Sequence, residues 1–157
     1  MTKMKIYGGL RHLKTSFFFA VAQLPMKGQW RLIFVKFGGV KIANKSRCFI
    51  GRNVTFDAVY PNQIIIGDHV HITAGCVLLT HYLDVSKNGV KWLHDGNIVL
   101  EDGCFLGINT IITRPLTIGR NSVVGGGSVV IKNIPPNEIW AGNPAHFIKR
   151  RCEKERD

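Results

Sequence analysis

The chain has 157 residues, of which 45% are hydrophobic and 20% are charged, and 21 Lys and Arg against 10 Asp and Glu give a formal net charge of +11. The ordinary apolar fraction excludes a disordered chain, and the 17 glycines lack the three-residue period of collagen. A single domain of this length can bury a core large enough to fold without cross-links.

The cysteines predict a reducing compartment. Four cysteines are too few for a disulfide scaffold, and no CxxC pair suggests a zinc or redox motif. The basic N-terminus leads into an aromatic run at residues 17–19, but this apolar stretch is too short for a secretion signal, and no stretch approaches the roughly 20 apolar residues of a bilayer span. We expect a cytoplasmic protein and leave open whether it works at the inner face of the membrane.

The positive charge does not predict a nucleic-acid partner. Basic residues fall mostly in two blocks, from Lys3 to Arg52 and from Lys132 to Arg156, and the middle of the chain is nearly neutral. Zinc-finger spacing, a recognition-helix pattern and interleaved aromatic and basic residues are all missing from the sequence. Two basic ends suit a phosphate-bearing small ligand, an anionic membrane surface or simple solubility.

Residues 1–37 predict one or two amphipathic helices that are interrupted near Pro25 and Gly28. Apolar residues recur at helical spacing in this N-terminal segment: Leu10, Leu13, Phe17, Val21, Leu24, Leu32, Ile33, Phe34 and Phe37. Two interpretations stay open. The segment either caps the domain that follows or anchors it weakly at a membrane interface, because Lys and Arg flank the aromatic residues.

A six-residue repeat organises residues 38–142. Aliphatic residues stand at a strict spacing of six: Leu100, Leu106, Ile112, Ile118, Val124 and Val130. Neither a helix, with its period of about 3.6, nor a strand, with its period of about 2, explains this spacing. The same phase continues upstream after offsets that we interpret as insertions: Ile50, Phe56, Ile66, Ile72 and Leu78.

Three such units make one turn of a triangular coil, and stacked coils pair their short strands in parallel about 4.8 Å apart. Small or thiol-bearing residues then avoid crowding at the corners: Cys76, Cys104, Thr110, Ser122 and Ser128. Glycine directly follows several of the inward aliphatics, and we expect it to relieve positive φ at the bends: Gly51, Gly67, Gly107, Gly119 and Gly125.

The repeat and the strings that follow it resemble the hexapeptide-repeat acyltransferases. Residues 118–130 read IGRNSVVGGGSVV, residues 132–137 read KNIPPN and residues 141–145 read AGNPA. Residues 31–42 are similar to the start of the branch that modifies polysaccharides, simple sugars and antibiotics. The resemblance implies an all-β fold, a left-handed parallel β-helix of hexapeptide repeats over 38–142, with a short helical N-terminal segment. A C-terminal extension over 143–157 begins with a turn at Asn143-Pro144 that leads to a final helical segment.

The repeat is broken at length only once, by an inserted loop at about 81–97 that carries polar and bulky residues. A regular coil offers no concavity, so a site is expected where this loop leaves it. The family resemblance makes His81 the catalytic base. An unperturbed imidazole has a pKa of about 6.5, so it can take a proton from an attacking hydroxyl near neutral pH.

Other loop residues are candidates for substrate binding: Asp84, Trp92 and His94. Asp84 could instead orient His81 or remain solvated. Cys104 could be proposed as an acyl nucleophile, but its place in the repeat points inward, which favours a buried structural thiol.

The resemblance also implies acetyl-CoA as co-substrate, no metal and a homotrimer with sites between subunits. Contacts with acetyl-CoA fall on six positions: Ile108, Gly126, Ile131, Lys132, His146 and Lys149. Ile108 and Ile131 replace small or hydroxyl residues of the family, and His146 replaces a frequent arginine, so Lys149 and the following arginines are expected to supply phosphate contacts.

The favoured function is an acetyl-CoA-dependent O-acetyltransferase that acts on a hydroxyl of a sugar or saccharide. Three alternatives remain: a serine O-acetyltransferase-like or other small-molecule acetyltransferase, a non-catalytic hexapeptide scaffold, and a γ-class carbonic-anhydrase-like zinc enzyme. The short N-terminal segment disfavours a serine O-acetyltransferase, because members of that family carry a long helical domain there. The spacing of His69, His71, His81 and His94 disfavours the last.

Overall fold

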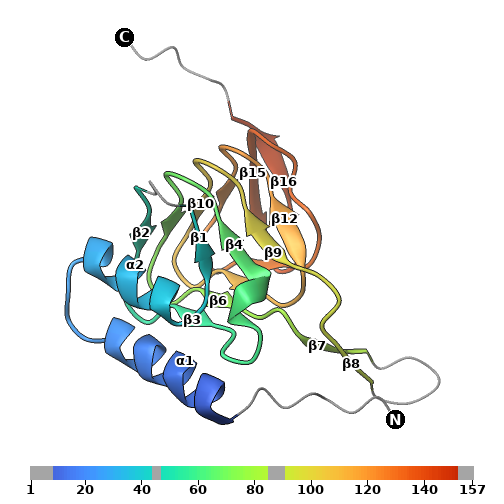
Figure 1. Cartoon of the computed structure of the whole chain (residues 1–157). Coiled ribbons are helices and arrows are strands. Elements are labelled where there is room, and N and C mark those ends of the chain that lie inside the picture. The colour runs from blue at the N-terminus through green and yellow to red at the C-terminus, as the bar shows by residue number, and fades with distance from the viewer. Residues whose placement is uncertain (1–8, 44–46, 85–90, 152–157) are drawn as a thin grey trace.

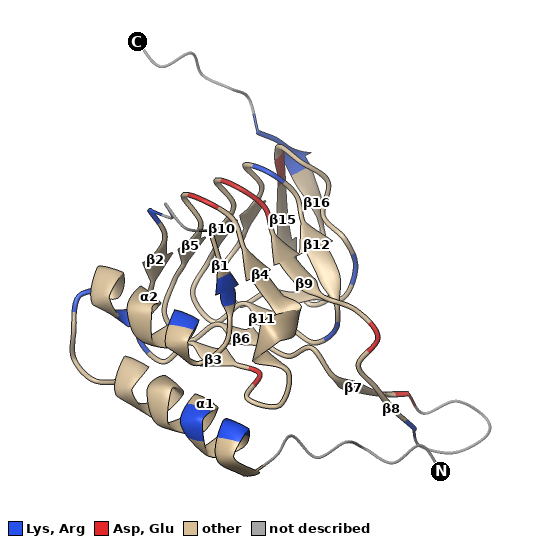
Figure 2. Cartoon of the chain, viewed as in Figure 1, with Lys and Arg blue, Asp and Glu red and all other residues tan. Residues whose placement is uncertain are grey.

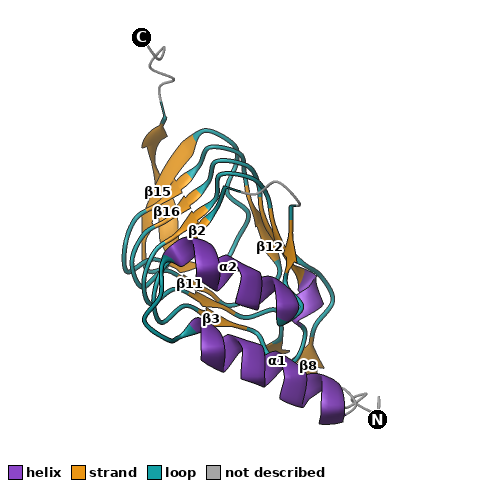
Figure 3. Ribbon diagram, turned by 60° about the vertical axis from the view of Figure 1, so that its left-hand side comes forward, coloured by secondary structure: helices purple, strands orange, loops and turns teal. Residues whose placement is uncertain are grey.

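The computed structural model describes residues 9–43, 47–84 and 91–151. Two helices, α1 (Gly9–Ala22) and α2 (Gly28–Phe37), precede a three-sided coil of short strands (Figures 1 and 3). Sheet A contains β1 (Lys41–Ile42), β4 (Ile64–Ile66), β9 (Ile98–Leu100) and β12 (Leu116–Ile118). Sheet C contains β3 (Thr55–Phe56), β6 (Val77–Leu78), β11 (Ile111–Ile112) and β14 (Val129–Val130).

Sheet B completes the triangle with β2 (Phe49–Ile50), β5 (His71–Ile72), β10 (Phe105–Leu106), β13 (Val123–Val124), β15 (Glu138–Gly142) and β16 (Ala145–Arg150). Every pairing between coils within the three sheets is parallel, and β16 is added to sheet B antiparallel to β15. The predicted parallel β-helix is confirmed, and it has the left-handed form of the hexapeptide-repeat proteins.

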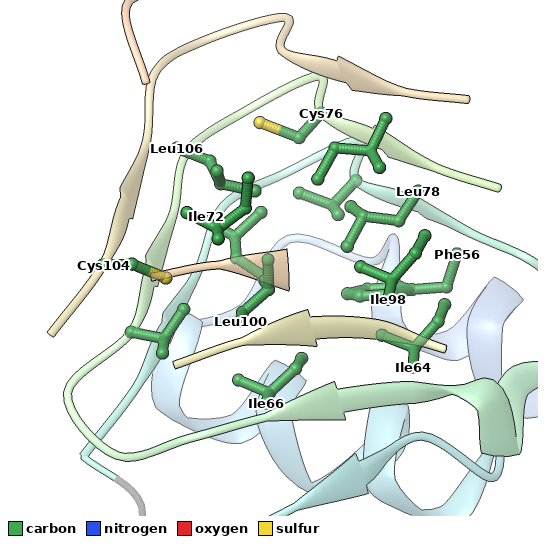
Figure 4. Packing of buried hydrophobic residues seen from close by; sticks show 14 of the residues in the cluster. Phe56, Ile64, Ile66, Ile72, Cys76, Leu78, Ile98, Leu100, Cys104 and Leu106 are labelled. Atoms are coloured by element: carbon green, nitrogen blue, oxygen red, sulfur yellow. The ribbon is translucent and has the colours of Figure 1, made fainter. Parts of the chain in front are cut away.

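The core is the column of inward aliphatic side chains that the repeat predicts. Ile72 stacks on Leu106, and Leu106 stacks on Val124, because each pair shares one register position in neighbouring coils. Figure 4 shows Ile72 and Leu106 pointing into the interior of the triangle, with the buried thiols Cys76 and Cys104 beside them toward the corners. Each inward position is fully or almost fully buried, so the column supplies the apolar burial that stabilises the coil.

Two insertions leave the coil at the same corner, between sheet C and sheet A. Leu106 pairs with Val124 eighteen positions later, which is one uninterrupted coil. Ile72 pairs with Leu106 thirty-four positions later, and the extra residues contain the antiparallel hairpin β7 (Tyr82–Asp84) and β8 (Lys91–Leu93). The coil before it, from Ile50 to Ile72, carries four extra residues and the short 3-10 helix η1 (Pro61–Gln63).

The prediction about glycine at the bends is wrong for the positions named. A Cβ on Gly107 would lie 2.4 Å from the backbone nitrogen of Gly126, and one on Gly119 would lie 2.5 Å from that of Pro136. These glycines therefore allow the backbones of adjacent coils to approach closely. Positive φ occurs two residues after each of these glycines, at Asn53, His69, Asn109, Asn121 and Gly127.

Arg31 ties the two helices to the first coil. Its buried guanidinium donates hydrogen bonds to the backbone carbonyl oxygens of Ala22 at 2.6 Å and Ile50 at 2.9 Å, and to those of Leu24 and Met26 in the turn between the helices. Burial, followed by the nearby charge of Arg52, lowers the pKa of Arg31. Phe19 of α1 lies against Phe56 of β3, with ring centroids 5.7 Å apart.

The C-terminal end also differs from expectation. The segment after Asn143-Pro144 is not helical but forms β16, which pairs antiparallel with β15. A strand there is favoured because β15 would otherwise present unpaired backbone groups at the edge of sheet B. Residues 152–157, including Cys152, lie outside the described residues.

The inward column makes a direct prediction for two neighbouring isoleucines. Ile112 is fully buried, whereas Ile111 precedes it on the same strand and points outward. We expect Ile112→Ala to lower the free energy of unfolding by about 2–5 kcal/mol, because it leaves a cavity in a packed core. Denaturant unfolding measures this. Ile111→Ala is the matched control and should cost less than half as much; equal losses would contradict the assignment of faces.

Candidate active site

The corner between sheets C and A brings Asp57 and His81 together. Asp57 follows β3 and His81 follows β6, and these two strands pair in consecutive coils. The backbone N–H of Asp57 donates to the carbonyl oxygen of Leu78 at 2.9 Å, which continues the ladder into the corner. The rigid scaffold therefore holds both residues, although they are 24 positions apart in the sequence.

Asp57 is a buried carboxylate with a full set of donors. Its side chain is 1% exposed, and its Oδ2 lies 2.5 Å from Nδ1 of His81. The same oxygen accepts hydrogen bonds from the hydroxyl of Thr80 at 2.7 Å and from the backbone N–H of Thr80 at 3.0 Å. The backbone N–H groups of Val59 and Tyr60 donate to Oδ1, at 2.8 and 3.3 Å.

These donors keep Asp57 ionised. Burial alone would raise the pKa of the carboxyl, but hydrogen bonds from the side chains of Thr80 and His81 and from the backbone of Val59 and Thr80 outweigh it and lower the pKa below its usual value. An ionised carboxylate can only accept hydrogen bonds, so the proton of a neutral His81 belongs on Nδ1. This leaves Nε2 as the unprotonated nitrogen of a ring that is 26% exposed.

Aromatic side chains from both insertions surround the imidazole. The indole ring of Trp92 in β8 lies 5.4 Å from the His81 ring, and the ring of Tyr60 lies 6.1 Å from it in an edge-on arrangement. Tyr60 also stacks on His94 at 4.6 Å. The side chain of Gln63 donates to the backbone carbonyl of His94 at 2.9 Å, which links the two insertions.

The predicted loop residues take different places in this arrangement. Trp92 and His94 lie within the cluster of rings around His81. Asp84 lies in the hairpin opposite Lys91, and the position beside Nδ1 of His81 that we considered for Asp84 is taken by Asp57. Substrate binding by Asp84, Trp92 and His94 stays a prediction. Residues 85–90 of the predicted loop lie outside the described residues.

Sequence reasoning missed Asp57, Tyr60 and the role of Thr80. One signal could have found them. The aliphatic phase shifts by four residues between Phe56 and Ile66, which marks an insertion at the corner that also carries the longer loop in the next coil. Asp57 is the polar residue at the start of this insertion. Because β3 and β6 pair in neighbouring coils, Asp57 is held against the residues that begin the longer loop, Thr80 and His81.

The six predicted cofactor residues flank the outer face of sheet C and continue onto β16. Ile108 and Gly126 share one corner, where the Gly127 N–H donates to the Ile108 carbonyl oxygen at 2.7 Å. Ile131 and Lys132 follow β14 at the other corner, where the Lys132 ammonium lies 5.0 Å from the Trp140 ring centroid. His146 and Lys149 are exposed on β16. A role of these residues in binding acetyl-CoA stays a prediction.

Cys104 is fully buried, and the expectation of an inward thiol is confirmed. Burial raises the pKa of Cys104 to about 12, with a smaller contribution from the neighbouring Cys48. A thiol in this state is neither exposed nor ionised near neutral pH, which makes it a poor nucleophile. Its role is packing.

The histidines that a zinc enzyme would need lie apart. His69 and His71 border a hollow of about 780 Å³ on the outer side of sheet B, whose lining contains neither Asp57 nor His81. His81 and His94 belong to the corner between sheets C and A. Among residues 9–43, 47–84 and 91–151, no group of three His, Cys, Asp or Glu side chains could hold a metal ion.

Comparisons with known proteins agree with this architecture. The family model described as "Hexapeptide repeat of succinyl-transferase" matches residues 46–80 and 97–132, which leaves out the hairpin insertion. The solved structure of a hexapeptide-repeat acetyltransferase from Vibrio cholerae, in complex with acetyl-CoA, superposes with a TM-score of 0.70 at 18% identity, over 92% of this chain and 89% of that one. The chain therefore carries the hexapeptide repeat and is similar to the hexapeptide-repeat acyltransferases.

Two curated relatives extend the comparison. The chain is 32% identical over 120 residues to the galactoside O-acetyltransferase of Escherichia coli strain K12, which covers 71% of this chain and 58% of that protein. It is 37% identical over 90 residues to the bifunctional protein GlmU of Rubrobacter xylanophilus, which covers 57% of this chain and 17% of that protein. The chain thus spans less than two thirds of the length of these relatives.

The lowered pKa of Asp57 predicts an acid-sensitive contribution to stability. The carboxylate stabilises the folded state above its ordinary pKa of 3.8, and this contribution is lost as the pH falls through the lower pKa of the folded state. We expect the difference in unfolding free energy between the wild type and Asp57→Asn to be largest near neutral pH and to shrink below about pH 4. Urea unfolding across this range measures it, and a difference that does not change with pH would contradict the assignment.

Proposed function

We propose that this protein is an acetyl-CoA-dependent O-acetyltransferase that transfers an acetyl group to a hydroxyl of a sugar or saccharide. The observation that carries the proposal is the pairing of His81 Nδ1 with the buried carboxylate of Asp57 at the corner where both insertions leave the coil. The similarity to the galactoside O-acetyltransferase of Escherichia coli supports the class of acceptor.

In the proposed reaction, Nε2 of His81 accepts the proton of the acceptor hydroxyl as its oxygen attacks the thioester carbonyl. The tetrahedral intermediate collapses, the C–S bond breaks, and the imidazolium returns the proton to the departing thiolate. Asp57 stabilises the positive charge that the ring carries between these two proton transfers. General-base catalysis of this kind contributes about 10²–10⁴-fold, and correct placement of the two reactants supplies a further part of the rate enhancement.

The residues present fit acetyl-CoA. The side chains of Ile108 and Ile131 are exposed on either side of the sheet C face and offer apolar contacts to the pantetheine arm. A Cβ on Gly127 would meet no atom within 4 Å, so the backbone there stays open to a ligand. The exposed Lys149 and the following arginines provide the positive charge that phosphate groups require.

The acceptor would lie against the aromatic cluster. The two insertions, and not the repeat, supply the aromatic side chains beside His81: Tyr60, Trp92 and His94. The shape of this aromatic wall is therefore independent of the core. Trp92 is 54% exposed, which leaves its ring available to the apolar face of a sugar. In this proposal Asp84 and the hairpin contribute to the choice of acceptor.

The proposed working unit is a homotrimer in the cytoplasm. Exposed apolar side chains on the outer faces, such as Phe49 and Phe105 of sheet B, support association of the coils side by side. Among the described residues, Cys76 and Cys104 are free, buried thiols, which suits a reducing compartment.

The proposal predicts that His81→Gln loses acetyl transfer but still binds acetyl-CoA. We expect the rate to fall by at least about 10²-fold because the base is missing. Release of free thiol measures transfer over a panel of nucleotide sugars, simple glycosides and polysaccharide fragments, and calorimetry measures binding. His69→Asn is the matched control, since asparagine tolerates the positive φ of that position and His69 lies at another corner. A fully active His81→Gln variant would refute the mechanism.

Asp57 acts in this mechanism as a positioning residue, and its replacement has a distinct signature. In Asp57→Asn, the side-chain amide can donate a hydrogen bond to Nδ1, which places the ring proton on Nε2 and removes the free base. We expect kcat to fall by about 10²–10⁴-fold, with the KM for acetyl-CoA unchanged. Asp84→Asn, by contrast, should raise the KM for the acceptor. If Asp84→Asn lowered kcat and Asp57→Asn did not, the orienting role would belong to Asp84.

A further inference from the structure

Helix α1 turns an apolar stripe toward solvent. Leu10, Leu13 and Phe17 recur at spacings of three and four, and each side chain is between 62% and 84% exposed. The face of α1 that packs on the protein carries Thr15, Phe19 and Ala22. Packing on the coil therefore leaves Leu10, Leu13 and Phe17 uncovered, and the exposure of this apolar stripe needs another explanation.

Helix α2 continues this surface. Trp30, Ile33 and Phe37 follow the same spacing and are between 45% and 58% exposed. The two stripes join through aromatic rings, because the Phe18 ring stacks on Phe37 and meets Phe17 edge-on, with centroids 5.5 Å apart in both pairs. We call the exposed sides of α1 and α2 the helical face. Figure 3 shows the two helices lying side by side at one end of the coil.

The charge around the helical face has one sign. Eleven of the 21 Lys and Arg, and none of the 10 Asp and Glu, precede Asp57, so the whole net charge of +11 resides in residues 1–56. Four of these basic residues flank the apolar stripes and are exposed: Arg11, Lys14, Lys27 and Lys36. Figure 2 shows basic but no acidic residues on the two helices, whereas both signs occur along the coil.

We propose that the helical face docks on the surface of an anionic lipid membrane. Exposed Leu, Phe and Trp flanked by Lys and Arg are the chemistry of a helix that lies in the headgroup region with its apolar side toward the acyl chains. None of the helices among the described residues is long and apolar enough to cross a bilayer, so the contact is peripheral. Arg31 and the Phe19–Phe56 contact hold the face rigidly on the coil.

The charge favours lipid over a second copy of the chain as the occupant. An interface that joined two helical faces would bring two groups of exposed lysines and arginines together without a carboxylate on either face. An anionic headgroup layer removes this repulsion, and each basic side chain that reaches it strengthens binding by about fivefold, which corresponds to about 1 kcal/mol.

Vesicle co-sedimentation of the full chain tests the proposal. We expect binding to vesicles that contain about 30% phosphatidylglycerol in phosphatidylcholine, little binding to phosphatidylcholine alone, and weaker binding when the salt concentration rises from about 0.1 to about 0.5 M. Lys14→Glu with Lys27→Glu should weaken binding at least about 20-fold. Leu13→Asp with Trp30→Asp should weaken it at least about tenfold.

The matched control reverses two exposed basic residues outside the face, Arg120→Glu with Arg150→Glu, and should change vesicle binding by less than about threefold, although the net charge changes equally. All variants alter exposed side chains, so circular dichroism should be unchanged. Equal binding to both kinds of vesicle, or equal losses in the control, would overturn the proposal. The proposal would also fail if the wild type did not bind vesicles and the Leu13→Asp/Trp30→Asp variant formed a smaller assembly than the wild type in sedimentation velocity. That result would assign the helical face to contact with a second copy of the chain.

Discussion

The structure depends on the close stacking of one inward aliphatic side chain per side of the triangle. Leu106 illustrates the constraint: it is fully buried between Ile72 above and Val124 below, in register with both. A column this narrow has no room for an extra residue within a strand, since one added position would turn the next aliphatic outward. Additional residues must leave at a corner, and the coil resumes afterwards in the same phase.

This constraint explains how a regular coil acquires a site. Both insertions leave at the corner between sheets C and A, in consecutive coils. The first residues of the two insertions therefore lie next to each other, as inward residues of neighbouring coils do. The backbone ladder holds Asp57, whose carboxylate accepts hydrogen bonds from Thr80 and pairs with Nδ1 of His81, which fixes the ring. The insertions themselves add Tyr60 and Trp92. The scaffold thus positions the base, and the insertions form the wall beside it.

Much of this organisation could be predicted from the sequence, because a six-residue period is incompatible with ordinary helices and strands. The position of His81 at the edge of the long insertion was also readable. Its partner was harder to find, because Asp57 is 24 residues away and the four-residue offset between Phe56 and Ile66 is the one signal that marks an insertion beside it. The close approach of coils at Gly107, the strand β16 and the outward stripe of α1 depend on neighbouring backbone or side chains that no local pattern reveals.

The tautomer of neutral His81 is the most direct test of the proposed pairing between Asp57 and His81. Long-range ¹H–¹⁵N correlation spectra of the protein labelled at its histidine nitrogens distinguish the two neutral tautomers. The buried, ionised Asp57 requires the proton of neutral His81 on Nδ1, with Nε2 unprotonated, and Asp57→Asn should abolish this preference. A wild-type ring that carries its proton on Nε2 would contradict the central claim that the stacked coils prepare this imidazole as a base.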